Sequence, residues 1–164
     1  MKKILLSVAV IAIIASCKKE STDPHMAGAD CGSCHTTEQS QWASSANLHA
    51  ASAADVLANA EHNTAELLTD DCLKCHSTFD AVAANLRGGI LATEGVSCES
   101  CHGPGSAYKS PTIMKDLALS QKNGLVIPTK ELCLKCHNKE NPFFKEFNYD
   151  AAHAKIAHKN PAAK

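Results

Sequence analysis

Four copies of one pentapeptide, Cys-x-x-Cys-His, carry the residues of this chain that are best suited to chemistry. Two thiols three residues apart can each form a thioether with one vinyl group of a porphyrin, and the histidine that follows can ligate the porphyrin iron. Because a histidine directly follows the second cysteine every time, we expect one haem c at each repeat. The repeats are Cys31–His35, Cys72–His76, Cys98–His102 and Cys133–His137.

These repeats predict four covalent haem c groups, each with one iron, which we number haem 1 to haem 4 in chain order. The attachment residues are Cys31, Cys34, Cys72, Cys75, Cys98, Cys101, Cys133 and Cys136. The proximal iron ligands are His35, His76, His102 and His137. Paired cysteines can instead form a disulfide framework or bind zinc, but neither use requires a histidine at the same place in all four repeats.

The remaining five histidines are candidates for the sixth position of the irons. A haem with two imidazole ligands is low-spin and has a low potential, which suits electron transfer, whereas a haem without a sixth protein ligand can bind a small molecule. In one predicted helix, His49 and His62 point about 220° apart, so they cannot serve the same haem face. The five candidates are His25, His49, His62, His153 and His158.

The amino terminus resembles the signal peptide of a bacterial lipoprotein. Two lysines precede an apolar stretch of 12 residues, which is too short to span a bilayer. Small residues then precede Cys17, as in the lipobox at which such signal peptides are cleaved and the cysteine is acylated. We therefore expect a signal peptide at residues 1–16, lipidation of Cys17, a flexible tether at 17–29 and a tetrahaem domain at 30–160.

This leader predicts a place in the bacterial cell envelope, as a periplasm-facing or outer-membrane lipoprotein held on the membrane by its acyl chains. Without residues 1–16 the chain has 14 basic and 17 acidic residues. Each haem adds two negative propionates, and each ferric porphyrin returns one positive charge, so the oxidised holoprotein would carry a net charge of about −7. An acidic protein without a basic stripe is not expected to bind nucleic acid, and its expected partners are a redox protein donor and acceptor with positively charged docking surfaces.

The apolar content is too low for an ordinary protein core. Leu, Ile, Val and Phe make up 24 of the 148 residues that follow the predicted signal peptide. When these four residue types fall below about 20% of a chain, it rarely buries enough apolar surface to fold alone. Four porphyrins would supply the missing apolar bodies, so we expect a mainly α, haem-packed multihaem cytochrome c domain with little regular secondary structure.

Helix-favouring segments alternate with glycine, proline and polar breaks along the chain. The longest predicted helix, residues 48–68, lacks both glycine and proline. A second predicted helix, at 112–121, begins after a serine and a proline and is closed by an Asn-Gly pair. The other predicted helices are 36–42, 80–87 and 150–159.

Three segments of the sequence resemble the tetrahaem cytochrome c-554 family, whose members take electrons from hydroxylamine oxidoreductase. The resemblance covers roughly residues 30–159, and the segment around the third repeat is the most distinctive. The three segments are Trp42 followed by His49-Ala50, Gly95–Gly105, and Phe147–Asp150 leading to Ile156–His158.

This resemblance implies that His49 and His158 are distal ligands of haems other than those of their own neighbours in sequence. It also implies that the haems stack in close pairs and that haem 2 tends to lack a protein sixth ligand.

The sequence also departs from the family in two places. The interval from Trp42 to His49 is longer than usual, and the second departure concerns haem 1. Family members commonly carry a histidine soon after Gly-Pro-Gly that ligates the first haem, and this chain has Ser106–Lys109 there instead. His62 or His25 could take over that role, with His62 the preferred candidate, and Tyr108 could do so as a phenolate.

Together these features predict a non-enzymatic electron carrier, a tetrahaem c-type cytochrome lipoprotein that relays single electrons between membrane or periplasmic redox partners. One alternative is a small reductase or oxidase that acts on a nitrogen oxide or hydroxylamine at a five-coordinate haem. Another alternative is a haem-bearing docking subunit that holds a partner. Arg87 is the only arginine, and the sequence shows no cluster of catalytic Arg, His and Tyr residues, which favours the carrier.

Overall fold

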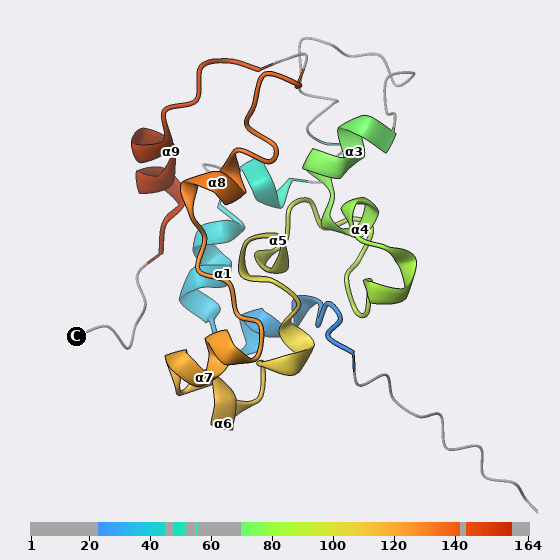
Figure 1. Cartoon of the computed structure of the whole chain (residues 1–164), viewed down its shortest axis with the longest axis vertical. Helices are drawn as coiled ribbons and strands as arrows, with labels where there is room; N and C mark the ends of the chain where they lie inside the picture. Colours follow the sequence, from blue (N-terminus) through green and yellow to red (C-terminus); the bar gives the residue numbers. More distant parts are fainter. Residues whose placement is uncertain (1–22, 45–47, 52–54, 56–69, 142–143, 159–164) are drawn as a thin grey trace, which may run out of the picture.

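The computed structural model describes residues 23–44, 48–51, 55, 70–141 and 144–158. Within these ranges the regular structure consists of short helices, and no strand is found. None of the helices in the described ranges is long and apolar enough to cross a membrane. Figure 1 shows α5 near the middle of the fold, with α1, α4 and α8 arranged around it. The fold class is therefore the expected one, mainly α with little regular secondary structure.

Most of the elements are one or two turns long. The α-helices are α1 (Thr36–Trp42), α3 (Asp70–His76), α4 (Thr78–Ala81), α5 (Cys98–His102), α6 (Pro111–Met114), α7 (Leu117–Lys122), α8 (Lys130–Cys133) and α9 (Tyr149–Ile156). The 3₁₀ helices are η1 (Ala29–Ser33), η2 (Leu48–Ala50), η4 (Ala84–Leu86) and η5 (Gly105–Ala107).

Two predicted helices agree with the structure and two are interrupted in it. The helix at 36–42 is confirmed as α1, and the helix at 150–159 is confirmed as α9 with slightly different ends. The helix predicted at 112–121 is wrong as one continuous element, because Asp116 adopts an extended backbone and its side chain accepts a hydrogen bond from Leu119 N, which starts α7 anew. Side-chain capping thus competes with helix continuation.

The helix predicted at 80–87 is also wrong as a continuous element. Ser77 caps α4 by accepting a hydrogen bond from Asp80 N, and the backbone becomes extended at Val82 before η4 begins. The long helix predicted at 48–68 begins with η2 in the structure, and most of its remaining length lies outside the described residues.

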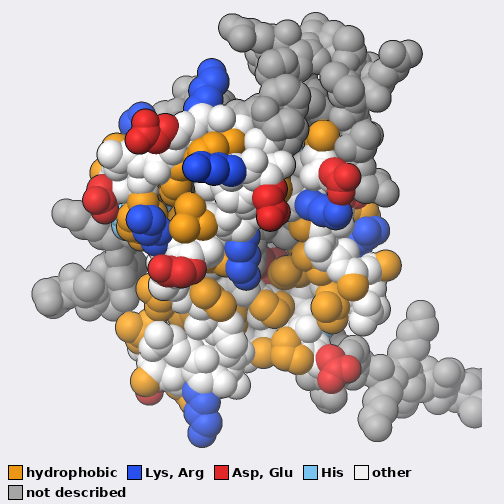
Figure 2. All heavy atoms as spheres, turned by 45° about the horizontal axis from the view of Figure 1, so that its top comes forward, with side chains coloured by type: hydrophobic (Ala, Val, Ile, Leu, Met, Phe, Trp, Pro, Cys, Tyr) orange, Lys and Arg blue, Asp and Glu red, His pale blue; other side chains and the backbone are white. Residues whose placement is uncertain are grey.

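The interior of the described chain is polar. Ile90 and Tyr108 are the only hydrophobic residues buried in it, whereas Thr78, Ser120 and Glu99 are exposed by 3% or less. Figure 2 shows hydrophobic side chains on the surface of one face, interspersed with acidic and basic ones. Several large hydrophobic residues are exposed, namely Leu91, Leu117, Leu119, Val126, Ile127 and Leu134. The expectation that the polypeptide builds no apolar core of its own holds for this part of the chain.

Hydrogen bonds to Thr78 join the second repeat to the third. Its hydroxyl accepts from Ser97 N at 2.7 Å and shares a hydrogen bond with Ser100 Oγ at 2.6 Å. Its backbone N donates to Gly95 O at 3.0 Å. A buried hydroxyl that is fully hydrogen-bonded avoids a desolvation cost of about 1 to 3 kcal/mol. The 21 residues between the two repeats therefore loop back on themselves.

A second polar connection centres on the carboxylate of Glu99, in the third repeat. Its two oxygens accept hydrogen bonds from Ala27 N at 2.6 Å, Gly28 N at 2.9 Å and Gly105 N at 2.6 Å. Gly28 has φ +78°, and a side chain there would collide with the carbonyl of Gly89. Only glycine allows the amino-terminal segment to pass this closely.

The segment just before the first repeat is tied to the rest of the fold. His25 N donates to Ser106 Oγ at 2.8 Å, and Met26 N donates to Leu86 O at 2.9 Å. The packed part of the chain thus begins before residue 30, where the domain was expected to start. Cys17, the predicted lipidation site, lies outside the described residues.

Replacing Glu99 with Gln should destabilise the holoprotein by about 2 to 4 kcal/mol, because the variant loses charge-assisted hydrogen bonds and turns an amide group toward backbone N–H donors. Chemical unfolding followed by absorbance and circular dichroism measures this change. Glu140→Gln, an exposed control, should change stability by less than about 0.5 kcal/mol. Equal stability of the Glu99→Gln variant and the control would show that the three bonds contribute little.

Candidate metal centres

Each repeat lies on one helical turn, which brings its two cysteines and its histidine together. The second and third repeats coincide with α3 and α5. In the first and fourth repeats the backbone N of the histidine donates to the carbonyl of the first cysteine, Cys31 or Cys133, at 2.9 Å. Residues three and four apart lie on one face of a helical turn. This local geometry suits attachment of one porphyrin and ligation of its iron.

Thiols from different repeats lie next to one another. The Cys31 thiol hydrogen-bonds with Cys98, which together with burial raises the pKa of Cys31. Burial and a hydrogen bond with Cys75 raise the pKa of Cys136 to about 12. The attachment points of haems 1 and 3 are therefore adjacent, and so are those of haems 2 and 4.

Two further thiols, those of Cys101 and Cys133, are near enough to interact electrostatically, and they link these two pairs. Burial and the neighbouring Cys133 raise the pKa of the Cys101 thiol, which places the third repeat beside the fourth. The described cysteines are all free thiols, so the alternative of a disulfide framework finds no support in them. Nor do the described residues contain a group of three or more His, Cys, Asp and Glu side chains that could hold a metal ion by themselves.

Two proximal histidines face a second imidazole from a distant part of the chain. The ring centroids of His137 and His49 are 6.0 Å apart, with an angle of 81° between the ring planes. The centroids of His102 and His158 are 5.8 Å apart, with an angle of 44°. A metal bonded to two imidazoles through bonds of about 2 Å holds their centroids about 6 Å apart. Both pairs thus fit an iron between the two rings.

Residues 30–103, which contain the first three repeats, match the family model described as cytochrome c554 and c-prime. The protein is a c-type cytochrome that resembles the c554 family. No curated protein and no solved structure matches the chain. The match supports electron transfer with covalently bound haem c as the role of this cytochrome.

A hydrogen bond positions the ring of His102, and ring stacking positions that of His137. His102 Nδ1 lies 3.0 Å from Val126 O, and Val126 N donates to His102 O at 2.9 Å. A histidine whose Nδ1–H is held by a carbonyl presents Nε2 to a metal. The ring of Phe147 stacks on His137 with 4.5 Å between centroids and an angle of 11°. The rings of His102 and His137 are therefore each held by a residue outside their own repeat.

His49 is positioned through its backbone. Its carbonyl accepts a hydrogen bond from Val96 N at 2.7 Å, and Trp42 Nε1 donates to Val96 O at 2.9 Å. The segment that leads into the third repeat thus holds both the end of α1 and η2. Two of the segments that resemble the family, Trp42 with His49-Ala50 and Gly95–Gly105, are therefore in contact in the structure.

The imidazoles of His49, His102 and His137 are in environments that lower their pKa and favour the neutral ring. Burial lowers the pKa of His49, and the nearby His137 and His76 lower it further. Burial likewise lowers the pKa of His137 and of His102. A hydrogen bond with the Val126 backbone raises the pKa of His102 in part, whereas the nearby His158 and His35 lower it. A metal ligand must be the neutral imidazole. The fold thus disfavours the protonated form that would compete with iron.

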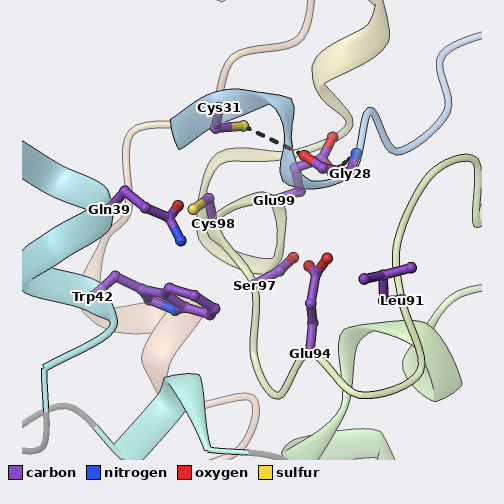
Figure 3. Close-up of a pocket in the computed structure, with 9 residues that line it drawn as sticks. All are labelled: Gly28, Cys31, Gln39, Trp42, Leu91, Glu94, Ser97, Cys98 and Glu99. Atoms are coloured by element: carbon purple, nitrogen blue, oxygen red, sulfur yellow. Dashed lines mark hydrogen bonds between the residues drawn. The ribbon is translucent and has the colours of Figure 1, made fainter. Parts of the chain in front are cut away.

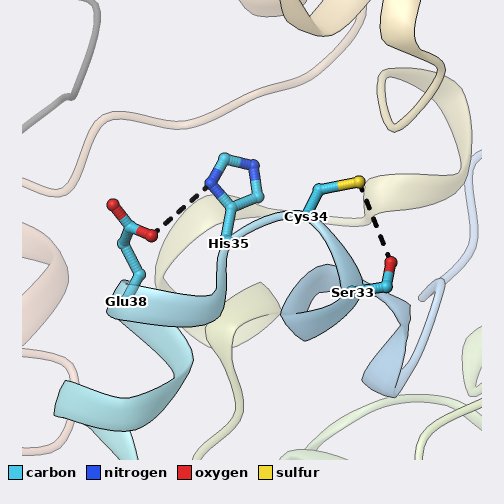
Figure 4. Close-up of polar contacts among 4 residues, drawn as sticks. All are labelled: Ser33, Cys34, His35 and Glu38. Carbon is cyan, nitrogen blue, oxygen red and sulfur yellow. Dashed lines mark hydrogen bonds and ion pairs between the residues drawn. The ribbon is translucent and has the colours of Figure 1, made fainter.

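The first repeat is arranged differently, as Figure 4 shows. The ring of His35 is followed by α1, and its Nδ1 lies 3.9 Å from Glu38 Oε2, beyond a direct hydrogen bond. The described residues place no second imidazole near His35 or His76 at the separation found in the two pairs. His62, the expected distal ligand of haem 1, lies outside the described residues.

Three further candidates of the sequence have other contacts. The hydroxyl of Tyr108 lies 3.0 Å from both His102 O and Gly103 O, and burial raises the pKa of Tyr108, so a phenolate ligand is disfavoured. The exposed ring of His153 stacks on Tyr149. His25 Nδ1 lies 3.1 Å from Asp23 O.

Sequence reasoning did not single out Glu99 or Thr78. Glu99 is the one acidic residue within any of the four repeats, and this was a usable signal because a charge beside an apolar porphyrin needs a partner. Thr78 carries no such signal.

Removing His49 or His158 should each convert one of the four irons from low spin to high spin, because each variant deletes one imidazole of a pair. Electron paramagnetic resonance of the oxidised protein measures this conversion. His153→Ala is the matched control and should leave the spectrum unchanged. A His158→Ala spectrum without a new high-spin signal would exclude this residue as a ligand.

Proposed function

We propose that this cytochrome is a tetrahaem lipoprotein that relays single electrons between redox partners at a membrane surface. The observation that carries the proposal is the continuous series of contacts between repeats. Cys31 contacts Cys98, Cys101 is beside Cys133, and Cys136 contacts Cys75. Haems attached there would follow the spatial order 1, 3, 4, 2, which differs from their order in the sequence.

The chain's own residues would set the properties of this relay. When bound, each haem supplies a one-electron iron couple, and the protein sets ligation, exposure and orientation. We assign His102 with His158 to haem 3 and His137 with His49 to haem 4, because each pair has the separation that an iron requires. The two middle haems of the series would then both have two imidazole ligands, which favours rapid electron passage without binding of small molecules.

The proximal ligands of haems 1 and 2 would be His35 and His76, and His62 remains the candidate distal ligand of haem 1. Haem 2 stays the expected site for an open sixth position, as the family resemblance implies.

Carrier function is favoured over catalysis by the position of the single arginine. The guanidinium of Arg87 lies over the ring of Phe79, 4.2 Å from its centroid, and its Nε donates to Val82 O at 3.1 Å. An arginine in these contacts holds local structure and is not directed toward a substrate anion. The expected partners are a donor and an acceptor redox protein, which the net negative charge of the holoprotein would select for basic docking surfaces.

The holoprotein should contain four haems and accept four electrons. Whole-protein mass spectrometry should show the mass of the chain plus four haem groups, and a reductive titration monitored by haem absorbance should consume about four electrons per protein. Replacing Cys133 and Cys136 with Ala should remove one haem and one electron equivalent. A mass without four haems would reject the proposed function.

Cys17 should hold the protein on the membrane. Replacing Cys17 with Ser should move the protein from the membrane fraction to the soluble fraction, because acyl chains can no longer be attached. Haem content should stay the same, since all haem thioethers use other cysteines. Immunoblots of the two fractions together with haem absorbance measure this. Retention of the variant on the membrane would reject the lipid anchor.

A further inference from the structure

A cavity of about 250 Å³ lies between the first and third repeats. Figure 3 shows its lining, with Cys31 and Cys98 from the two repeats, Trp42 on one side, and Glu94 on the loop that precedes α5. A thioether forms at each of these two cysteines when haem is attached. Haem 1 and haem 3 must therefore both have an edge close to this cavity.

Two oxygen atoms in the cavity lack a hydrogen-bond partner among the described residues. They are Glu94 Oε1 and Ser97 Oγ, and both atoms are fully buried. Figure 3 shows the side chains of Glu94 and Ser97 among those that line the cavity. Buried polar atoms without a partner are rare in folded proteins and are frequently found at functional sites.

Glu94 differs from the other carboxylate at this cavity. Glu99 accepts three backbone hydrogen bonds and is held in place, whereas Glu94 has one oxygen without a partner. The described residues that line the cavity include no Lys, Arg or His to neutralise Glu94. The ionisable group that faces Glu94 from a neighbouring element is Glu99 on α5, because Cys98 on α5 and Cys31 on η1 form thioethers that cannot ionise once haem is attached.

These surroundings weaken the ionised form of Glu94. Burial raises the pKa of Glu94, a hydrogen bond with the Leu91 backbone opposes this, and the nearby Glu99 raises the pKa further. Reduction of a nearby haem removes one positive charge from its iron. A carboxylate beside the haem then loses an attractive interaction, so its affinity for a proton increases.

We propose that Glu94 is a redox-linked proton acceptor, which takes up one proton from solvent when the iron of haem 1 or haem 3 gains one electron. The donor redox protein loses one electron to ferric iron, and Glu94 Oε1 forms one O–H bond with the proton. The added electron is thus balanced by the added proton at the same cavity. Ser97 Oγ is the neighbouring group that can accept a hydrogen bond from the new carboxylic acid.

Proton uptake at Glu94 makes the reduction of this haem depend on pH. The reduced state binds the proton more tightly than the oxidised state, so its reduction potential falls as pH rises through the range in which Glu94 titrates. Above and below that range the potential is independent of pH, because Glu94 keeps the same protonation state in both redox states. The inference rests on the proposed function, since it requires haems at the first and third repeats.

Redox potentiometry of the holoprotein from about pH 5 to 8 tests the proposal. In the wild-type protein the potential of one haem should fall as pH rises, by up to about 59 mV for a tenfold drop in proton activity. In Glu94→Gln, which keeps the shape of the side chain but cannot ionise, this slope should disappear. Glu140→Gln, the exposed control, should keep the wild-type slope. Potentials that are independent of pH in the wild type, or an unchanged slope in Glu94→Gln, would overturn the proposal.

Infrared difference spectra between the oxidised and reduced protein provide a second measurement. Reduction of the wild type should produce the band of a protonated carboxylic acid, and Glu94→Asp should shift that band. If Glu94→Gln does not load four haems, these spectra decide, and the absence of the band in the wild type overturns the proposal. A protein without four haems rejects the proposed function itself, whereas four haems with potentials independent of pH reject only the role of Glu94.

Discussion

The arrangement of the described chain depends on the hydrogen bonds that the carboxylate of Glu99 accepts. Two of the donors lie in the segment before the first repeat, 71 and 72 residues from Glu99 in the sequence. The third donor lies in the turn after the third repeat, six residues from Glu99. Because Glu99 lies between the two cysteines of the third repeat, it connects these segments directly to a haem attachment point. A buried carboxylate with three charge-assisted bonds is stabilising, whereas the same group without them would be costly.

This dependence on polar contacts follows from the composition of the chain. With Ile90 and Tyr108 as the only buried hydrophobic residues in the described part, packing of apolar side chains cannot supply the usual driving force for folding. Thr78 and Glu99 instead hold short helical turns in place through hydrogen bonds that cross between repeats. Such bonds are directional, so they position the thiols and imidazoles that must meet a flat, rigid cofactor at the correct angle.

The order of the contacts between repeats has a consequence for electron transfer. In the proposed relay, a series that runs 1, 3, 4, 2 would place the two ends at the first and second repeats and the two imidazole pairs in the middle. The cavity with Glu94 lies at one end of that series, between the first and third repeats. A proton acceptor at this position would couple pH to the step at which electrons enter or leave, and not to transfer between the middle haems.

The sequence alone determined the class of cofactor and much of the local structure. Covalent attachment and proximal ligation need residues that are adjacent in the chain, so each Cys-x-x-Cys-His repeat can be recognised without a fold, and α1 follows from its local composition. The tertiary structure decided which repeats are neighbours, that His49 faces His137 and His158 faces His102, and that Glu94 opens into a cavity. These are contacts between residues far apart in the chain, and their formation depends on hydrogen bonds such as those of Glu99, whose partners no local pattern in the sequence identifies.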